Sequence, residues 1–323
     1  MRTEIGSEFW SIPTDSSDNI VFSENVKWFA SGRSALQAII AENKFKEVSL
    51  PEWCCESMIV PFLKNGISVS FYDALNPPKS FSSDAILVMD YFGYSSDKTY
   101  EDYDGVVIRD ITHSLFSKRY HDADYYFGSL RKWSAFYGGG FAWGFKEEIH
   151  YDDGCEAYCD IRQDAISQKQ LFITDQSQSK EYLRMFSKAE ELLDGIGIVK
   201  SCERDIELAK KLDVEFIKNA HRNNAKVLLD AFSDIALFPN PKPYDCPMFV
   251  PILVKDRDNL HKWLIQNEIY FPIHWPKTEY HVLSDKTKRI FDEEISLVCD
   301  QRYTEKDMQR IVDTIKQFWK EGK

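Results

Sequence analysis

The sequence has little of what marks membrane, secreted or nucleic-acid-binding proteins. Its first residues carry no apolar signal core, and its aliphatic runs are short, as at residues 85–89. A membrane-spanning helix needs roughly 20 apolar residues, so we predict that these runs are buried strands. Lys and Arg (40) are outnumbered by Asp and Glu (52), and the net charge of -12 disfavours nucleic-acid or anionic-membrane partners.

A disulfide framework and a metal site are also missing. The seven cysteines are odd in number and follow no regular spacing. Together with the absence of a signal peptide, this predicts a reducing, cytoplasmic location. His150, Cys155 and Cys159 lack a fourth ligand nearby, so we expect no metal site there.

The length and composition suit a large globular protein. The chain has 323 residues, 43% of them hydrophobic, which is enough for one large domain and a smaller one. We expect an N-terminal arm and a large domain over residues 1–215, and a small C-terminal α+β domain over residues 216–323. Residues 1–20 are predicted to form an extended arm.

Short apolar runs alternate with helical patterns in the first half of the chain. This alternation predicts an α/β fold with a mostly parallel sheet covered on both faces and with sites at the carboxyl ends of strands. The expected strands are 48–50, 69–72, 85–89, 106–108, 125–127 and 141–143, and the expected helices are 32–43 and 55–65. Later elements are expected as helices over 180–193, 203–218, around 222, over 259–266 and from 304, and as strands over 248–254 and 270–273.

Lys132 is the leading candidate for a catalytic residue. It lies in the segment Ser129-Leu130-Arg131-Lys132, after an expected strand and before the glycines 138–140. An amine near a hydroxyl and a glycine-rich turn is the pattern of a lysine that forms a Schiff base with pyridoxal 5'-phosphate (PLP). Ser129 would bind the phosphate. A basic surface turn is the alternative for the segment taken alone.

Asp110 and His113 follow another expected strand. A carboxylate at a buried strand end needs a partner, and a protonated pyridine nitrogen would be one. His113 would then touch the ring or its phenolic oxygen. The alternative is an Asp that caps the next turn and a His that is satisfied in the core.

The segment Ser31-Gly32-Arg33-Ser34 begins the first expected helix. Free backbone N–H groups and the helix dipole favour an anion at such a position, so Gly32, Arg33 and Ser34 are candidates for a phosphate turn. An ordinary helix N-cap explains the same residues.

Together these segments resemble the DegT-type sugar aminotransferase family, within the fold-type I PLP-dependent aminotransferases. The matching pieces are Ser31 to Leu36, Pro51-Glu52-Trp53, Asp110 to His113, and Ser129 to Trp133 leading to the glycines. The resemblance implies a three-layer fold around a seven-stranded sheet. It also implies a homodimer whose active sites are shared between subunits.

The resemblance also implies roles for single residues. Lys132 corresponds to the Schiff-base lysine, Asp110 to the carboxylate at the pyridine nitrogen, and Ser129 to a phosphate ligand. Trp53 falls near the aromatic that covers the ring face, although a core tryptophan is the alternative. Many members have a Gly-Glu-Gly-Gly motif after the lysine, whereas this chain has Tyr137 and three glycines and lacks the acid.

Two residues of the C-terminal region are candidates for substrate contacts. Arg302 could hold a carboxylate or phosphate, or it could form a structural ion pair. His274 could face the substrate, or it could be an ordinary loop residue.

The function implied is transfer of an amino group from an amino acid such as glutamate to a keto group. The acceptor would be a nucleotide-linked keto-deoxy sugar for surface polysaccharide. One alternative is a PLP-dependent sugar dehydratase, although the family's dehydratases replace the lysine with histidine. A non-catalytic binding or regulatory descendant of the fold is the other.

Overall fold

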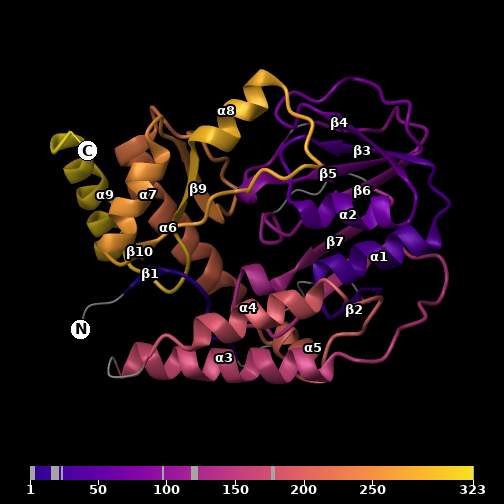
Figure 1. Ribbon diagram of the computed structural model, residues 1–323, viewed down its shortest axis with the longest axis horizontal. Helices are drawn as coiled ribbons and strands as arrows, with labels where there is room; N and C mark the ends of the chain where they lie inside the picture. The colour runs from indigo at the N-terminus through magenta and orange to yellow at the C-terminus, as the bar shows by residue number, and fades with distance from the viewer. Residues whose placement is uncertain are drawn as a thin grey trace.

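A seven-stranded sheet forms the centre of the large domain (Figure 1). The computed structural model describes residues 4–15, 22, 25–96, 98–117, 123–175 and 179–322, so part of the expected arm lies outside the described residues. The strands of the sheet are β2 (Lys27–Phe29), β3 (Glu47–Pro51), β4 (Ser68–Tyr72), β5 (Ala85–Met89), β6 (Val106–Asp110), β7 (Tyr125–Ser129) and β8 (Gly140–Trp143).

The strand order is β2-β8-β7-β6-β5-β3-β4. Strands β3 to β7 run parallel, whereas β8 is antiparallel to both of its neighbours. The predicted mostly parallel, seven-stranded sheet is therefore confirmed. Asp110 is the last residue of β6 and Ser129 the last of β7, so the carboxyl ends of two adjacent strands carry predicted site residues.

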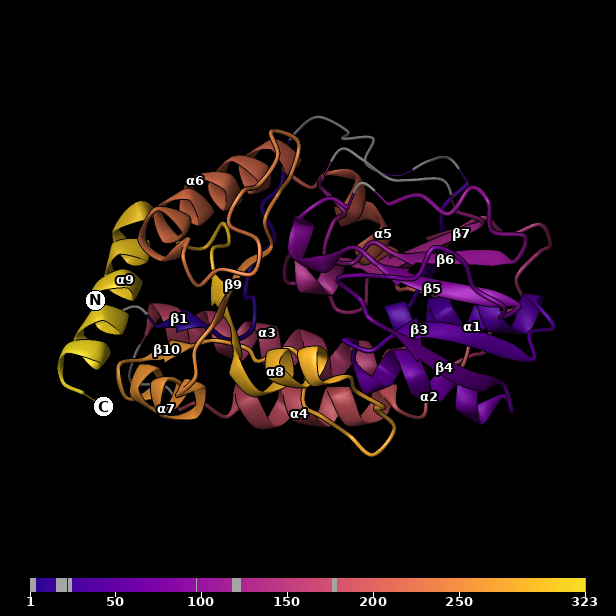
Figure 2. The same cartoon turned by 90° about the horizontal axis from the view of Figure 1, so that it is seen from above.

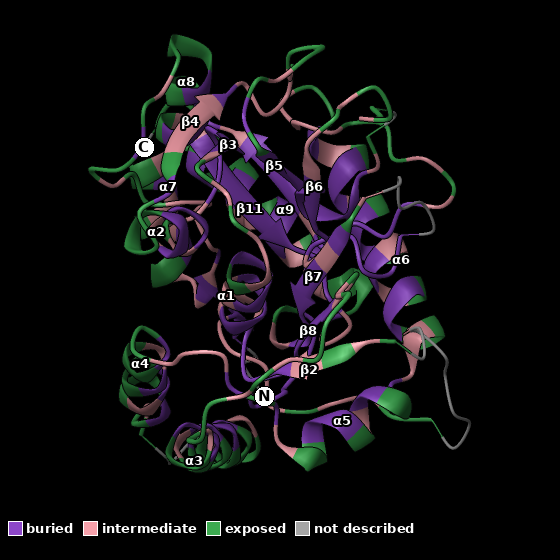
Figure 3. Cartoon of the chain, turned by 90° about the vertical axis from the view of Figure 1, so that its right-hand side faces the viewer, coloured by how far each residue is buried: buried purple, intermediate pink, exposed green. Residues whose placement is uncertain are grey.

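Strand β5 shows how the two faces of the sheet are covered. Leu87 and Met89 pack into a core with helices α1 (Gly32–Glu42) and α2 (Glu56–Lys64). Ile86 alternates to the opposite face, where loop side chains such as Tyr103 cover it. The alternation is that of a strand buried on both sides. Burial along β5 and β6 is nearly continuous in Figure 3.

Three helices run along the lower side of Figure 1. They are α3 (Glu156–Thr174), α4 (Tyr182–Leu193) and α5 (Glu203–Lys210). The single helix expected over 203–218 is wrong, because the chain breaks between α5 and α6 (Val214–Phe232). The carboxylate of Asp213 accepts a hydrogen bond from the Phe216 N–H and begins a new helix there.

The C-terminal unit lies beside the sheet (Figure 2). After α6 it contains β9 (Phe249–Leu253), α7 (Arg257–Gln266), β10 (Ile269–Tyr270), α8 (Asp285–Glu293), β11 (Glu294–Val298) and α9 (Glu305–Lys320). β9 and β11 pair antiparallel, and β1 (Ile5–Gly6) pairs parallel with β10. The N-terminal arm thus contributes a strand to this unit, and Ile5 packs in its core. The domain boundary expected after residue 215 falls in the first turn of α6.

The last helix begins as its sequence predicts. Thr304 and Asp307 form a capping box, in which the Asp307 carboxylate accepts from the Thr304 N–H at 2.8 Å. Its apolar stripe, from Met308 to Phe318, is buried in the core of the C-terminal unit. Across the residues that the structure describes, no helix is both long and apolar enough to cross a membrane.

Candidate active site

Two neighbouring cavities lie where β6 and β7 end. The smaller has a volume of about 240 Å³ and the larger about 710 Å³. Both are lined by Lys132, His113, Arg131, Glu190 and Trp275, so the two cavities meet at Lys132.

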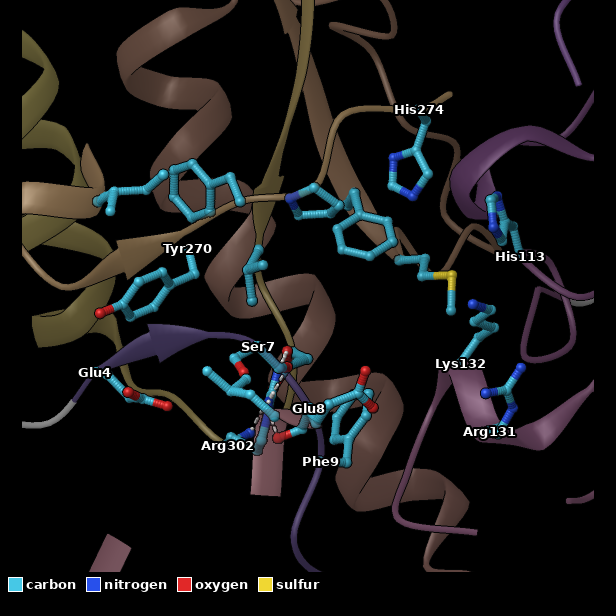
Figure 4. A pocket seen from close by; sticks show the side chains of 18 of the residues that line it. Glu4, Ser7, Glu8, Phe9, His113, Arg131, Lys132, Tyr270, His274 and Arg302 are labelled. Atoms are coloured by element: carbon cyan, nitrogen blue, oxygen red, sulfur yellow. Dashed lines mark hydrogen bonds and ion pairs between the residues drawn. The ribbon is translucent and has the colours of Figure 1, made fainter. Parts of the chain in front are cut away.

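Lys132 follows β7 in a short 3-10 turn, Leu130–Lys132, and its side chain extends into the larger cavity (Figure 4). The residue is exposed at the wall of that cavity. Its amine has no hydrogen bond or ion pair with any described residue. The surrounding protein limits hydration of the ammonium and Arg131 repels it, which together lower the pKa of Lys132 to about 8. An unpaired amine with a depressed pKa is suited to act as a nucleophile.

Asp110 faces the smaller cavity from the end of β6. Its side chain is almost fully buried and accepts a hydrogen bond from the Thr112 N–H at 2.8 Å. Burial raises the pKa of Asp110 to about 6 despite that hydrogen bond. No described cation forms an ion pair with this carboxylate. A cationic group entering the cavity would therefore be stabilised beside it.

His113 lines both cavities. Its ring stacks on Phe92 with centroids 4.9 Å apart and an interplanar angle of 22°, and it is nearly parallel to Trp275 at 5.9 Å. Burial and the nearby Lys132 lower the pKa of His113 to about 3, so the imidazole is neutral. Its Nδ1 is buried and has no partner. The ring thus offers a flat face and one free nitrogen.

Ser129 is buried at the end of β7, and its hydroxyl has no hydrogen-bond partner. The start of α1 lies next to it: a Cβ added at Gly32 would be 3.6 Å from the Ser129 Cβ. Ser31, Gly32 and Arg33 line the smaller cavity. A free buried hydroxyl beside a helix N-terminus is a suitable place for an anion.

The remaining two residues of the predicted phosphate turn point to other partners. The Arg33 guanidinium pairs with Asp194 at the end of α4, although its Nε has no partner. The Ser34 hydroxyl donates to the Gly197 carbonyl at 2.6 Å and accepts from the Val199 N–H at 2.8 Å. Ser34 thus ties α1 to residues 197–199 and does not line the smaller cavity. In this structure its hydroxyl is engaged in those two bonds.

Trp53 lies in the hydrophobic core of the large domain. It is fully buried, lines neither cavity, and stacks on Tyr91 at 4.7 Å. Its indole N–H donates to the His274 carbonyl at 2.6 Å. The tryptophan that borders both cavities is Trp275, the residue after that carbonyl. Trp53 is the core tryptophan of the alternative, and it helps to place Trp275.

Arg302 lines the larger cavity, but its donors are already engaged. Its Nε and Nη2 bind Asp300 at 2.8 and 2.7 Å, and its Nη1 donates to the carbonyls of Ser7 and Glu8 at 2.9 and 3.0 Å. The side chain is 5% exposed. The structure therefore shows the structural ion pair, and Arg302 fixes the N-terminal arm against the C-terminal unit (Figure 4).

His274 lies opposite His113 at the same end of the larger cavity (Figure 4), with ring centroids 5.8 Å apart. Its Nδ1 is 2.8 Å from the Ser296 hydroxyl. Burial, His113 and Lys132 all lower the pKa of His274, so this imidazole is neutral too. The placement keeps His274 available for a substrate contact.

Two carboxylates that line the larger cavity were not predicted from the sequence. Glu190 of α4 forms an ion pair with Arg131, and Glu8 of the arm lies 3.6 Å from Arg162 of α3. Both carboxylates reach the cavity from segments distant in sequence, and no local motif marks them. Across the described residues, no group of His, Cys, Asp or Glu is arranged to hold a metal ion.

The seven-stranded, mostly parallel sheet with a lysine after β7 is the arrangement that the comparisons with solved structures address. Solved structures of sugar aminotransferases superpose on most of the chain, which confirms the resemblance at the level of fold. PseC of Helicobacter pylori, an aminotransferase involved in pseudoaminic acid biosynthesis, has a TM-score of 0.68 at 14% identity, covering 98% of this chain and 100% of its own.

Two further solved structures are similar. A DegT DnrJ EryC1 StrS aminotransferase of Brucella abortus has a TM-score of 0.62 at 17% identity, covering 91% of this chain and 85% of its own. Spr1654 of Streptococcus pneumoniae, a candidate sugar aminotransferase solved in its PLP form, has a TM-score of 0.61 at 13% identity, covering 95% and 92%. No family model and no curated protein matches the sequence.

Proposed function

We propose that this protein is a PLP-dependent aminotransferase that moves an amino group from an amino acid such as glutamate to a keto group. The acceptor we propose is a nucleotide-linked keto-deoxy sugar used in surface polysaccharide biosynthesis. One observation carries the proposal. Asp110 ends β6, Ser129 ends β7 and Lys132 lies in the 3-10 turn that follows β7; all three border one cavity, and each has unused bonding capacity there.

The residues fit the chemical groups of PLP. The Ser129 hydroxyl and the N–H groups at Gly32 suit a phosphate, because both are free donors at a helix N-terminus. Asp110 suits a protonated pyridine nitrogen, since a buried carboxylate is stabilised by a charged donor. His113 and Trp275 present aromatic faces to the same space.

When bound, PLP supplies an electron sink that stabilises negative charge on the substrate carbon. The chain's own residues then have distinct tasks. Lys132 would hold the cofactor covalently through its amine and would serve as the group that moves a proton at the reacting carbons. Asp110 would hold the pyridine nitrogen protonated. The neutral imidazoles of His113 and His274 offer hydrogen bonds without adding charge to the cavity.

The larger cavity is where we place the amino donor and the acceptor. Of the Lys and Arg side chains that line it among the described residues, three are engaged with carboxylates: Arg131 with Glu190, Lys180 with Glu4, and Arg302 with Asp300. An anionic nucleotide needs further cations. This need supports the proposed homodimer, in which the partner subunit completes each site.

A half-reaction tests the proposal. Purified protein mixed with PLP should gain a visible absorbance that glutamate shifts, with release of the matching keto acid. Lys132→Ala should lose both signals, because no other unpaired amine borders the described cavity. Lys316→Ala, which removes an exposed lysine of α9, should behave like the wild type.

The acceptor is tested by incubating the aminated enzyme with a panel of nucleotide-linked keto sugars and measuring the masses of the products by mass spectrometry. An amino sugar is the expected product. Full turnover by Lys132→Ala would refute the assignment of Lys132. A deoxygenated product without nitrogen would show that the reaction is elimination and not transamination.

A further inference from the structure

The turn that follows Lys132 is held by side chains from distant helices. Asp205 of α5 accepts from the N–H groups of Tyr137 and Gly138 at 3.2 and 2.7 Å, across 67 residues of sequence in the second case. From α3, the Tyr158 hydroxyl donates to the Tyr137 carbonyl at 2.5 Å, and Arg162 donates to the Phe136 carbonyl at 3.3 Å. Side chains therefore bond both the C=O and the N–H of two successive peptide groups in this turn.

This glycine turn, residues 136–140, packs directly against the start of α1. A Cβ added at Gly138 would lie 2.4 Å from the Ala30 carbonyl oxygen, and one at Gly140 would lie 2.3 Å from the Ser31 backbone. Both distances are too short for any side chain to fit. The turn thus fixes the backbone that leads into Gly32, and its Gly139 carbonyl also accepts from the Leu130 N–H at 2.8 Å. It contacts both the phosphate turn and the 3-10 turn of Lys132.

Burial of the Asp205 carboxylate beside this turn costs free energy of folding. Its side chain is fully buried, and burial raises the pKa of Asp205 although two N–H groups and Arg204 bind it. A buried carboxylate destabilises a protein unless its hydrogen bonds are retained. The glycine turn itself contains no acidic residue, and Asp205 brings a carboxylate to it from α5.

We propose that Asp205 is a positioning residue for the cofactor phosphate. By binding the N–H groups of Tyr137 and Gly138, it holds the glycine turn against Ala30 and Ser31 and so sets the position of the Gly32 N–H group. This inference rests on the proposed function, because it assigns the phosphate of PLP to the start of α1. It assigns no contact between Asp205 and the cofactor itself.

The test compares PLP with pyridoxal, which lacks the phosphate. Asp205→Asn keeps the shape of the side chain but replaces one acceptor oxygen by an NH₂ group, which cannot accept from a backbone N–H. We expect the Kd for PLP to rise roughly tenfold, as for loss of one buried charge-assisted hydrogen bond, and the Kd for pyridoxal to stay unchanged. Hydrogen exchange at the Tyr137 and Gly138 amides should become faster even without any cofactor.

The matched control is Asp213→Asn, whose carboxylate also accepts from a backbone N–H, that of Phe216 at 3.0 Å, but at the start of α6. It should leave both dissociation constants unchanged. A variant that only destabilised the fold would weaken the binding of PLP and of pyridoxal equally. The ratio of the two dissociation constants therefore isolates the positioning role.

A second substitution tests the same turn without touching the buried charge. Gly138→Ala must push the turn away from Ala30, whereas Gly195→Ala meets only the Leu192 carbonyl at 3.9 Å. We expect Gly138→Ala to weaken the binding of PLP more than that of pyridoxal. Gly195→Ala should weaken the binding of neither.

The possible failures are distinguishable. If the wild type binds PLP but Asp205→Asn and Gly138→Ala keep its full preference over pyridoxal, the positioning role is overturned and the proposed function stands. If the wild type itself shows no preference for PLP, the proposed function fails and the inference fails with it.

Discussion

The two cavities adjoin at Lys132, and the opposite ends of the combined space differ in how their polar groups are bonded. At the lysine end, formed by Lys132, His113, Asp110 and Ser129, the polar groups are underused: the amine has no described partner, and the Ser129 hydroxyl and His113 Nδ1 are buried and unsatisfied. At the arm end, formed by Arg302, Asp300, Glu4, Lys169 and Lys180, the charges are paired and hydrogen-bonded.

The difference separates structure from function. Buried polar groups in folded proteins are satisfied, and the exceptions need an explanation. At the arm end the bonds join segments nearly 300 residues apart, as in the Arg302 bond to the Ser7 carbonyl, so their purpose is to dock the arm. At the lysine end the missing partners match the groups of one cofactor. If this contrast is right, substitutions at the arm end cost stability, and those at the lysine end cost binding.

The largest expected effect is at the arm end. Arg302→Ala leaves Asp300 as an uncompensated buried charge and removes the bonds to the arm, so we expect a loss of about 3–5 kcal/mol in the free energy of unfolding. Chemical denaturation measures it. Arg289→Ala, which breaks an exposed pair with Glu293, should cost no more than about 0.5 kcal/mol. Equal losses in the two variants would contradict a docking role for Arg302.

Asp110→Asn should stabilise the protein that lacks cofactor. The folded-state pKa of Asp110 is raised from 3.8 to about 6, so the charged form is disfavoured by folding. The stability that its protonation contributes is fully present below about pH 3.8 and is lost as the pH rises through about 6. The asparagine variant has no such loss, so above pH 6 it should be more stable by about 3 kcal/mol.

The same variant should lose function. Without a negative charge beside the pyridine nitrogen, the half-reaction with glutamate should slow by roughly two orders of magnitude. Thermal unfolding across pH 4 to 8 and single-turnover absorbance measure the two effects. A variant that is less stable than the wild type at pH 7 would show that Asp110 is a structural cap.

Ser129→Ala should separate binding from stability. Its hydroxyl makes no hydrogen bond, so its loss should change the free energy of unfolding by less than about 0.5 kcal/mol, while the Kd for PLP rises by about fivefold or more. Ser117→Ala is the matched control. Its buried hydroxyl donates to the Gly93 carbonyl and accepts from the Cys246 N–H, so that variant should lose about 1 kcal/mol of stability and bind PLP normally.

The smallest effect is expected for Lys180→Met. Lys180 is 37% exposed and shares Glu4 with the buried Lys169, so Glu4 keeps a partner. The stability should fall by no more than about 1 kcal/mol, and PLP titration should give the wild-type Kd. Weaker PLP binding would show that the arm end takes part in the cofactor site after all.

Local patterns made the lysine end predictable. Asp110 and Ser129 end apolar runs that can only be strands, and adjacent parallel strands bring their carboxyl ends together. The docking of the arm was not predictable, because the carbonyls of Ser7 and Glu8 that Arg302 binds lie at the other end of the chain and β1 is only two residues long.

Helix α3 shows a second limit of the sequence. Its buried residues include Arg162 and Lys169, which a pattern of apolar positions assigns to the surface. Trp53 and Trp275 show a third. The order of the motifs placed an aromatic near the cofactor, but only the fold shows which tryptophan lies in the core and which one faces the cavity.

The most direct test of the central claim is to reduce the protein with borohydride after adding PLP and to map the modified peptide. The account predicts one pyridoxyl group per chain, on Lys132, because this lysine has an open cavity and a pKa lowered to about 8. The Lys132→Ala protein should take up none. A label spread over surface lysines, or no label at all, would contradict it.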